Sequence, residues 1–98
     1  MHNPPSVPDR HVEALIHLIR GQRMILGPDL ADLYGVPTRV LMKAVRRNMA
    51  RFPDDFMIEL TRKEIQGMSQ FVTSLKYSKA VFAFTEHGVA MMSGVLRS

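Results

Sequence analysis

The tight turn Gly35-Val36-Pro37 constrains the fold more than any other feature of the chain. The segment before it opens with Gly27-Pro28-Asp29, where a proline in the first helical turn loses no hydrogen bond. Gly35 ends this segment, because glycine tolerates the left-handed backbone that helix C-termini often adopt. Pro37 cannot continue the helix, and Thr38 is suited to cap a new one. The sequence therefore predicts two helices joined by a tight turn.

The second of these helices is predicted to run from Thr38 to Ala50 and to be amphipathic. At 100° per residue, one side carries mainly apolar residues, namely Val40, Leu41, Ala44, Val45, Asn48 and Met49. The other side is mainly cationic and carries Arg39, Met42, Lys43, Arg46 and Ala50, with Arg47 at its flank. Phe52-Pro53 then stops the helix. We expect the apolar side to face the core and the cationic side to face water.

Positive charge is concentrated on this helix. Five of the thirteen residues from Arg39 to Arg51 are Lys or Arg, and no acidic residue lies between Asp32 and Asp54. The net charge of +4 by itself says little about a partner, since many soluble domains are mildly basic. Such a pattern also occurs on ordinary solvated helix faces, but the local absence of acids favours a polyanionic partner.

The N-terminal part of the chain is predicted to form a leader and a hairpin. Residues 1–10 contain three prolines and are expected to be flexible, which leaves residues 11–98 as one domain. Two short apolar segments, 14–19 and 24–26, flank Gly21 and favour a β-hairpin. A helix from His11 to Ile19 is the competing interpretation, because the apolar residues there also match a 3.6-residue period.

The second half of the chain mixes short strands with helices. Thr61 and Glu64 have the spacing of a capping box, and Thr85-Glu86 is suited to start a final helix. The predicted elements are a strand with Phe56, Ile58 and Leu60 on one face, a helix from Thr61 to about Met68, an ambiguous loop or strand over 69–73, an exposed tip over 74–80, a strand over 81–84 and a largely apolar helix over 86–97. The predicted fold class is therefore α+β.

The exposed tip carries a second group of residues that are suited to a polyanionic partner. Lys76, Tyr77 and Lys79 lie between two predicted strands, an arrangement that resembles a wing. The lysines are suited to contact phosphates and the tyrosine to enter a groove. A polar loop without such a role is the equally good alternative from these residues alone.

Enzymatic and metal-binding functions have little support in the sequence. The chain has no cysteine, which excludes a disulfide framework and a thiolate metal site. The four histidines are scattered, and no P-loop, G-x-S-x-G or G-x-G-x-x-G pattern is present. No apolar run is long enough to span a membrane, and the N-terminus lacks a signal-peptide core. We expect a cytoplasmic protein without catalytic activity, cofactor or metal.

Several segments together resemble the ORF6N domain, a member of the KilA-N-like group of DNA-binding domains. The resemblance extends from about Leu15 to Ser98 and covers a set of blocks in order, namely Ile19–Leu26, Asp29–Val36, Arg47-Asn48 with Arg51–Met57, Ser69–Ser74, Phe84–Met91 and Val95–Ser98. Members occur in bacteria, phages and prophages, often as the N-terminal module of antirepressor-like or regulatory proteins. The resemblance implies a small winged-helix-like domain with an N-terminal hairpin, a helix-turn-helix and a C-terminal helix.

The resemblance and the charge pattern together predict a double-stranded DNA partner. The candidate DNA-binding residues are Thr38, Arg39, Met42, Lys43, Arg46, Arg47, Arg51, Lys76, Tyr77 and Lys79. Arg39, Met42, Lys43 and Arg46 are expected to face the groove, whereas Arg47, Arg51 and the tip lysines are expected to contact phosphates. The alternative is a protein-interaction module that binds a repressor or forms a homodimer through the apolar C-terminal helix.

Overall fold

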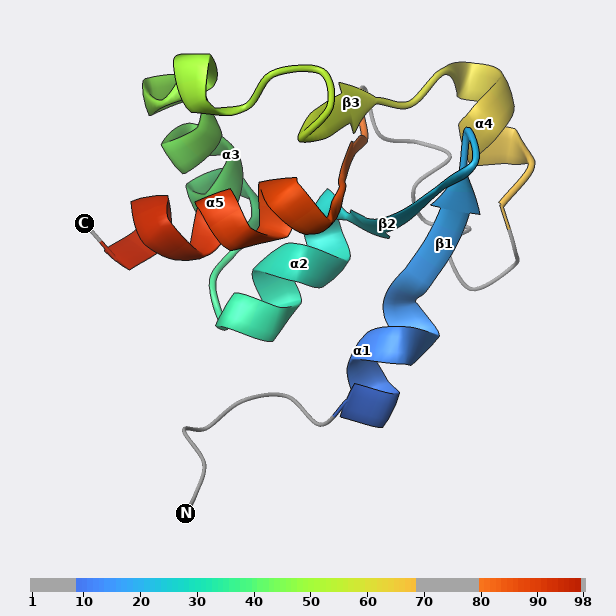
Figure 1. Ribbon diagram of the computed structural model, residues 1–98, viewed down its shortest axis with the longest axis horizontal. Helices are drawn as coiled ribbons and strands as arrows, with labels where there is room; N and C mark the ends of the chain where they lie inside the picture. The colour runs from blue at the N-terminus through green and yellow to red at the C-terminus, as the bar shows by residue number, and fades with distance from the viewer. Residues whose placement is uncertain (1–8, 69–79, 98) are drawn as a thin grey trace.

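The computed structural model describes residues 9–68 and 80–97. These residues form five α-helices, four β-strands and one short 3-10 helix (Figure 1). In chain order the elements are α1 (Asp9–Leu15), β1 (Ile16–Ile19), β2 (Gln22–Leu26), α2 (Gly27–Tyr34), α3 (Thr38–Arg47), η1 (Met49–Arg51), β3 (Met57–Glu59), α4 (Arg62–Gln66), β4 (Phe82–Phe84) and α5 (Glu86–Arg97). The predicted α+β fold class is confirmed.

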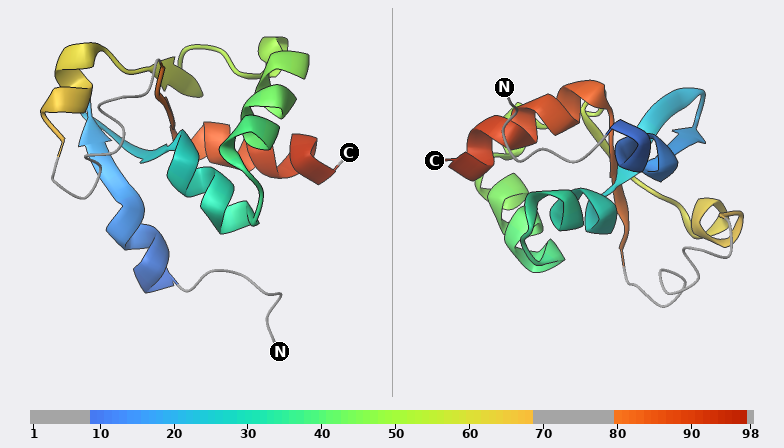
Figure 2. Two further views of the ribbon diagram at one scale, coloured as in Figure 1. Left: turned by 180° about the vertical axis from the view of Figure 1, so that it is seen from behind. Right: turned by 90° about the horizontal axis from the view of Figure 1, so that it is seen from below.

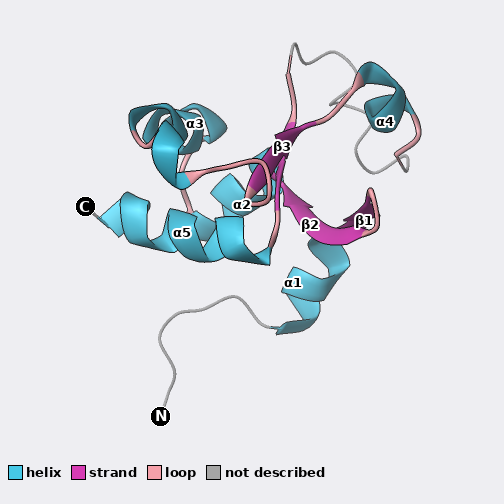
Figure 3. Cartoon of the chain, turned by 45° about the horizontal axis from the view of Figure 1, so that its top comes forward, coloured by secondary structure: helices cyan, strands magenta, loops and turns pink. Residues whose placement is uncertain are grey.

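The four strands form one antiparallel sheet in the order β1-β2-β4-β3 (Figure 3). β1 and β2 are the predicted hairpin, and Arg20 and Gly21 between them both have positive φ, 52° and 77°. Positive φ at both central residues is the requirement of a type I′ turn, which matches the twist of the paired strands. β4 then enters the sheet between β2 and β3, so the chain's last strand lies in the middle of the sheet.

The two competing interpretations of the N-terminal segment are each right for part of it. The hairpin begins only at Ile16, and the residues before it form α1, a short helix that starts at Asp9. The last two residues of the expected leader, Asp9 and Arg10, thus belong to a helix, and residues 1–8 lie outside the described residues. The ambiguous segment 69–73 and most of the expected tip, 74–79, also lie outside them.

Helices cover both faces of the sheet. α2, α3 and α5 gather on one side and α4 lies on the other (Figure 2). The larger core lies on the first side and includes Leu30, Leu41, Phe84 and Met92, whereas the smaller core lies under α4 and includes Ile65. Phe84 is fully buried and packs edge to face against Phe52, with ring centroids 6.0 Å apart. The main core therefore joins α3 and α5 to the middle of the sheet.

Because helices cover both faces of the sheet, the pattern of burial around β3 differs from the expected one. Phe56, Ile58 and Leu60 were expected to share the buried face, but Met57 between them is buried in the larger core. Ile58 and Leu60 pack in the smaller core, and Phe56 precedes the strand and packs against the larger one. Alternating side chains point to opposite faces of a sheet, so both sets are apolar where both faces are covered.

The final helix begins as predicted at a threonine cap. The backbone N–H of Gly88 donates to the Thr85 hydroxyl at 3.3 Å, and that hydroxyl donates to the Asp55 carbonyl oxygen at 2.8 Å. Thr85 thus ties the start of α5 to the turn before β3. α5 places Met92 and Val95 in the larger core, while its Ala90 and Gly94 are exposed. Burial of this helix is therefore one-sided, although its sequence is apolar nearly all round. None of the described helices is long and apolar enough to cross a membrane.

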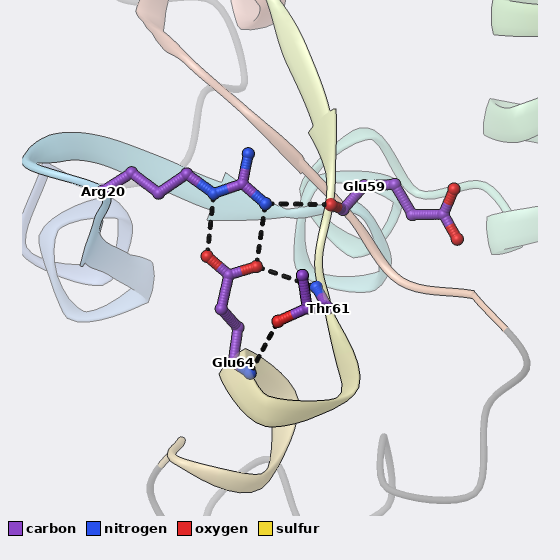
Figure 4. A network of polar contacts seen from close by, with 4 residues as sticks. All are labelled: Arg20, Glu59, Thr61 and Glu64. Carbon is purple, nitrogen blue, oxygen red and sulfur yellow. Dashed lines mark hydrogen bonds and ion pairs between the residues drawn. The ribbon is translucent and has the colours of Figure 1, made fainter.

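An ion pair connects the hairpin turn to α4, and Figure 4 shows its geometry. The Arg20 guanidinium donates to both carboxylate oxygens of Glu64, at 2.8 and 2.9 Å, and to the Glu59 carbonyl oxygen at 3.3 Å. Glu64 and Thr61 form the predicted capping box, with bonds of 2.8 and 3.1 Å. Hydrogen bonds from Arg20 and from the Thr61 N–H lower the pKa of Glu64 to about 2. This carboxylate therefore stays ionised over a wide pH range.

Candidate nucleic-acid interface

The turn between α2 and α3 has the geometry that its sequence predicts. Gly35 adopts the left-handed conformation, with φ 71° and ψ 28°. Its N–H donates to the Asp32 carbonyl, and the Val36 N–H donates to the Ala31 carbonyl, each at 3.0 Å. These two bonds satisfy carbonyl groups that the end of α2 would otherwise leave without partners. The turn fixes the direction in which the chain leaves α2 and enters α3.

The two ends of α3 differ from the prediction. Pro37 occupies the N-cap position and Thr38 is the first helical residue, so the threonine side chain does not cap the helix. At the other end the helix stops at Arg47 instead of Ala50. The Asn48 side chain donates to the Ala44 carbonyl at 2.8 Å, and a 3-10 turn, η1, follows. An asparagine amide bonded back to the helix competes with the backbone N–H groups that would extend it.

Two fully buried residues anchor α3 to the rest of the domain. Leu41 and Val45 lie one turn apart, are almost inaccessible to solvent and belong to the larger core. Their neighbours in this core include Leu30 of α2 and Met92 of α5. A buried leucine and a buried valine each stabilise the fold by about 1.5–3 kcal/mol relative to exposure. The orientation of α3, and hence the direction in which its other face points, is set by this packing.

The opposite face of α3 is cationic and open to solvent. The exposed cations there are Arg39, Lys43, Arg46 and Arg47, and Arg51 of η1 is exposed as well. Thr38 is also exposed, at the N-terminal end of the helix. In the part of the chain that the structure describes, none of these five cations forms a salt bridge. Their charges are therefore not neutralised within the described fold. Six of the ten predicted residues are thus exposed on one helix and the turn that follows it.

The remaining four predicted residues differ from these six. Met42 is half-buried and packs against the larger core, contrary to the expectation that it faces outward. The position of Met42 on the helix explains this, because it is one residue from Leu41 and three from Val45, which are both buried. Lys76, Tyr77 and Lys79 lie outside the described residues.

Two apolar residues that the sequence placed on the core side are exposed instead. Val40 has 38% of its surface exposed and Met49 has 54%. Met49 is exposed because α3 ends before it, so the 100° spacing no longer applies. The periodic spacing of apolar residues over 38–50 predicts one unbroken helix with a centred apolar face. It therefore could not show that Val40 and Met49 are exposed.

Histidine and acidic side chains are the candidate metal ligands in the described ranges 9–68 and 80–97. No group of three or more His, Cys, Asp or Glu side chains there is arranged to hold a metal ion. His17 lies in β1 opposite Met24, and His87 stacks on Phe56 with ring centroids 5.5 Å apart. Asp54 and Asp55 lie in the turn before β3, as expected.

The fold and this surface define a class: a small α+β domain in which two helices joined by a tight turn present a basic helix. Comparison with known families makes the assignment specific. The family model described as the ORF6N domain matches residues 14–95. Because this match covers most of the chain, the protein belongs to the ORF6N domain family. No curated protein and no solved structure showed significant similarity to the chain.

Proposed function

We propose that this protein is a double-stranded DNA-binding module of a phage- or prophage-type regulatory protein. One observation carries the proposal: the exposed face of α3 and η1 presents five cations that have no acidic partner in the described structure. Membership of the ORF6N family supports it, because such domains are regarded as DNA-binding modules. A cytoplasmic location and the absence of an enzymatic activity belong to the same proposal.

The dimensions of α3 fit the major groove. An α-helix with its side chains is about 10–12 Å wide and the major groove is about 12 Å wide. The proposed base-facing residues are Arg39, Lys43 and Arg46, which lie at spacings of three and four and so share one side of the helix. Arg47 and Arg51 would contact phosphates, together with Lys76 and Lys79 of the tip, whereas Tyr77 would enter a groove. Arginine suits both tasks because its fork bonds bidentately to guanine or to phosphate.

The position of Arg39 distinguishes a binding role from a purely stabilising one. Arg46 and Arg47 lie in the last turn of α3, where cations interact favourably with the helix dipole. Arg39 lies in the first turn, which contains no acidic residue and where a cation is unfavourable by about 0.3–1 kcal/mol. The stability of α3 does not explain an arginine at this position, whereas the binding of an anion by its side chain does explain it.

The salt dependence of binding tests the proposal. If about five phosphates are neutralised, the logarithm of the binding constant falls against the logarithm of salt concentration with a slope near −4.5. Fluorescence anisotropy with a pool of labelled duplexes measures this slope. We expect the double variant Arg39→Ala/Arg46→Ala to bind more weakly and with a shallower slope than the parent protein.

A matched control removes two positive charges elsewhere. Arg23 of β2 and Lys63 of α4 are exposed, and Arg23→Ala/Lys63→Ala changes the net charge by the same amount. The control should bind DNA nearly as well as the parent. If the folded α3 variant and the control lose equal affinity, only the net charge matters and the assignment to α3 is wrong. If the folded parent binds no duplex at low salt, the proposed function itself fails.

The alternative function, a module that dimerises through α5 or binds a repressor, has less support. Its motivation was the apolar character of α5, but Met92 and Val95 are buried in the larger core and Met91 and Leu96 pack against that core. These side chains are largely used within the domain. Light scattering should therefore give the mass of a monomer, and a stable dimer would restore the alternative.

A further inference from the structure

Val40 is an apolar residue that stays partly exposed on α3. It lies in the first turn of the helix and is 38% exposed, although the residue next to it, Leu41, is fully buried. The half-buried residue Met42, by contrast, packs against the larger core. More than a third of the surface of Val40 is therefore open to a partner that approaches the outer side of α3.

The surroundings of Val40 on the helix are cationic. Lys43 follows Val40 at a spacing of three and Arg47 at a spacing of seven, so both lie near the valine on the exposed side, whereas the half-buried Ala44 lies on its other side. A single exposed apolar residue is ordinary on protein surfaces. One at the edge of a face of unpaired cations is different, because an anion that binds the cations also approaches the valine.

The major groove offers one prominent apolar group to such a residue. Bases present hydrogen-bond donors and acceptors at their groove edges, and thymine adds its 5-methyl group. We propose that Val40 is a specificity-determining residue that contacts the 5-methyl group of a thymine in the major groove. This inference rests on the proposed function, since it requires that α3 enters the groove.

The position and stiffness of Val40 fit this task. In helix-turn-helix proteins the N-terminal residues of the recognition helix contact base edges, and Val40 is the third residue of α3. A valine in a helix adopts one χ1 rotamer about 90% of the time, so little side-chain entropy is lost when it makes a fixed contact. The longer cations beside it contact phosphates or polar base edges while the short valine meets the methyl group.

Deletion of single methyl groups from the DNA tests the inference. A duplex is first selected from a random library, and each thymidine is then replaced in turn by deoxyuridine, which lacks only the 5-methyl group. Loss of one buried methyl group corresponds to about fourfold weaker binding. For the parent protein we expect this loss at one thymidine position. For Val40→Ala we expect weaker binding to the thymidine duplex and no further loss on replacement at that position.

Two comparisons separate this inference from the proposed function. Leu18→Ala shortens an exposed apolar residue of β1, outside α3, and should keep the full sensitivity of the parent. The salt slope of Val40→Ala should equal that of the parent, because no charge is removed. Equal sensitivity to deoxyuridine in Val40→Ala and the parent, or no sensitive position in the parent, would overturn the role of Val40 and leave DNA binding by α3 intact. Absence of any DNA binding would instead refute the proposed function.

Discussion

Replacement of Gly88 by alanine should destabilise the domain, although the same change stabilises most helices. Gly88 is buried near the start of α5, where the helix approaches the backbone of the turn before β3. A Cβ atom at this position would lie 2.0 Å from the Phe56 carbonyl oxygen and 2.9 Å from the Phe56 carbonyl carbon. The neighbouring atoms belong to the backbone, so no side-chain rotation relieves the contact.

The size of the effect follows from the bonds that meet at Phe56. Its carbonyl oxygen accepts hydrogen bonds from the Thr85 N–H at 2.9 Å and from the Thr85 hydroxyl at 3.2 Å. A shift that accommodates the new methyl group weakens these bonds at about 1 kcal/mol each and strains the core by about 1–3 kcal/mol. The higher helix propensity of alanine than of glycine offsets up to about 1 kcal/mol of this loss of stability. We expect a net loss of about 2–4 kcal/mol, or a fall in Tm of at least about 8 °C.

Gly94 provides the matched control in the same helix. It is exposed, and a Cβ atom built there meets no other atom within 4 Å. Gly94→Ala should therefore leave Tm unchanged or raise it, because the helix propensity of alanine adds up to about 1 kcal/mol of stability. Thermal unfolding followed by circular dichroism compares both variants with the parent. A Gly88→Ala protein at least as stable as the Gly94→Ala protein would refute the close approach of α5 to Phe56.

Two further predictions concern the ion pair and the turn. Because Arg20 lowers the pKa of Glu64 to about 2, the pair contributes stability above the unfolded-state pKa of about 4.3 and loses it as pH falls towards 2. In urea unfolding, Glu64→Gln should be less stable than the parent at pH 7 and nearly equal to it near pH 2; a constant difference would contradict this. At Gly35, with φ 71°, alanine should cost about 1–2 kcal/mol, and Gly35→Asn should cost less, because asparagine adopts this conformation more readily. Equal Tm values for the two variants would argue against a left-handed turn.

Local physical chemistry made several elements of this protein predictable from the sequence. The left-handed end of α2 at Gly35, the hairpin turn at Gly21 and the capping box of Thr61 and Glu64 each depend on residues within a few positions of one another. The cap of α5 by Thr85 is equally local. The exposed cationic face of α3 was also predictable, because four charged residues at helical spacing cannot all be buried without partners.

Contacts between distant residues decided the features that the sequence did not reveal. Arg20 and Glu64 are 44 residues apart, and nothing in either segment indicates that the fold pairs them. Met57 is buried because β4, far along the chain, places β3 in a sheet that helices cover on both faces. The buried centre of α3 depends in the same way on where α2 and α5 contact it.

The sequence by itself determined that a basic amphipathic helix follows a tight turn. Only the tertiary structure decided which residues of that helix are available to a partner. It turned Met42 towards the larger core and left Val40 exposed beside the cations. The physical reason is that periodicity fixes the relative angles of side chains on a helix, whereas the absolute rotation of the helix is set by the packing of Leu41 and Val45 against other elements.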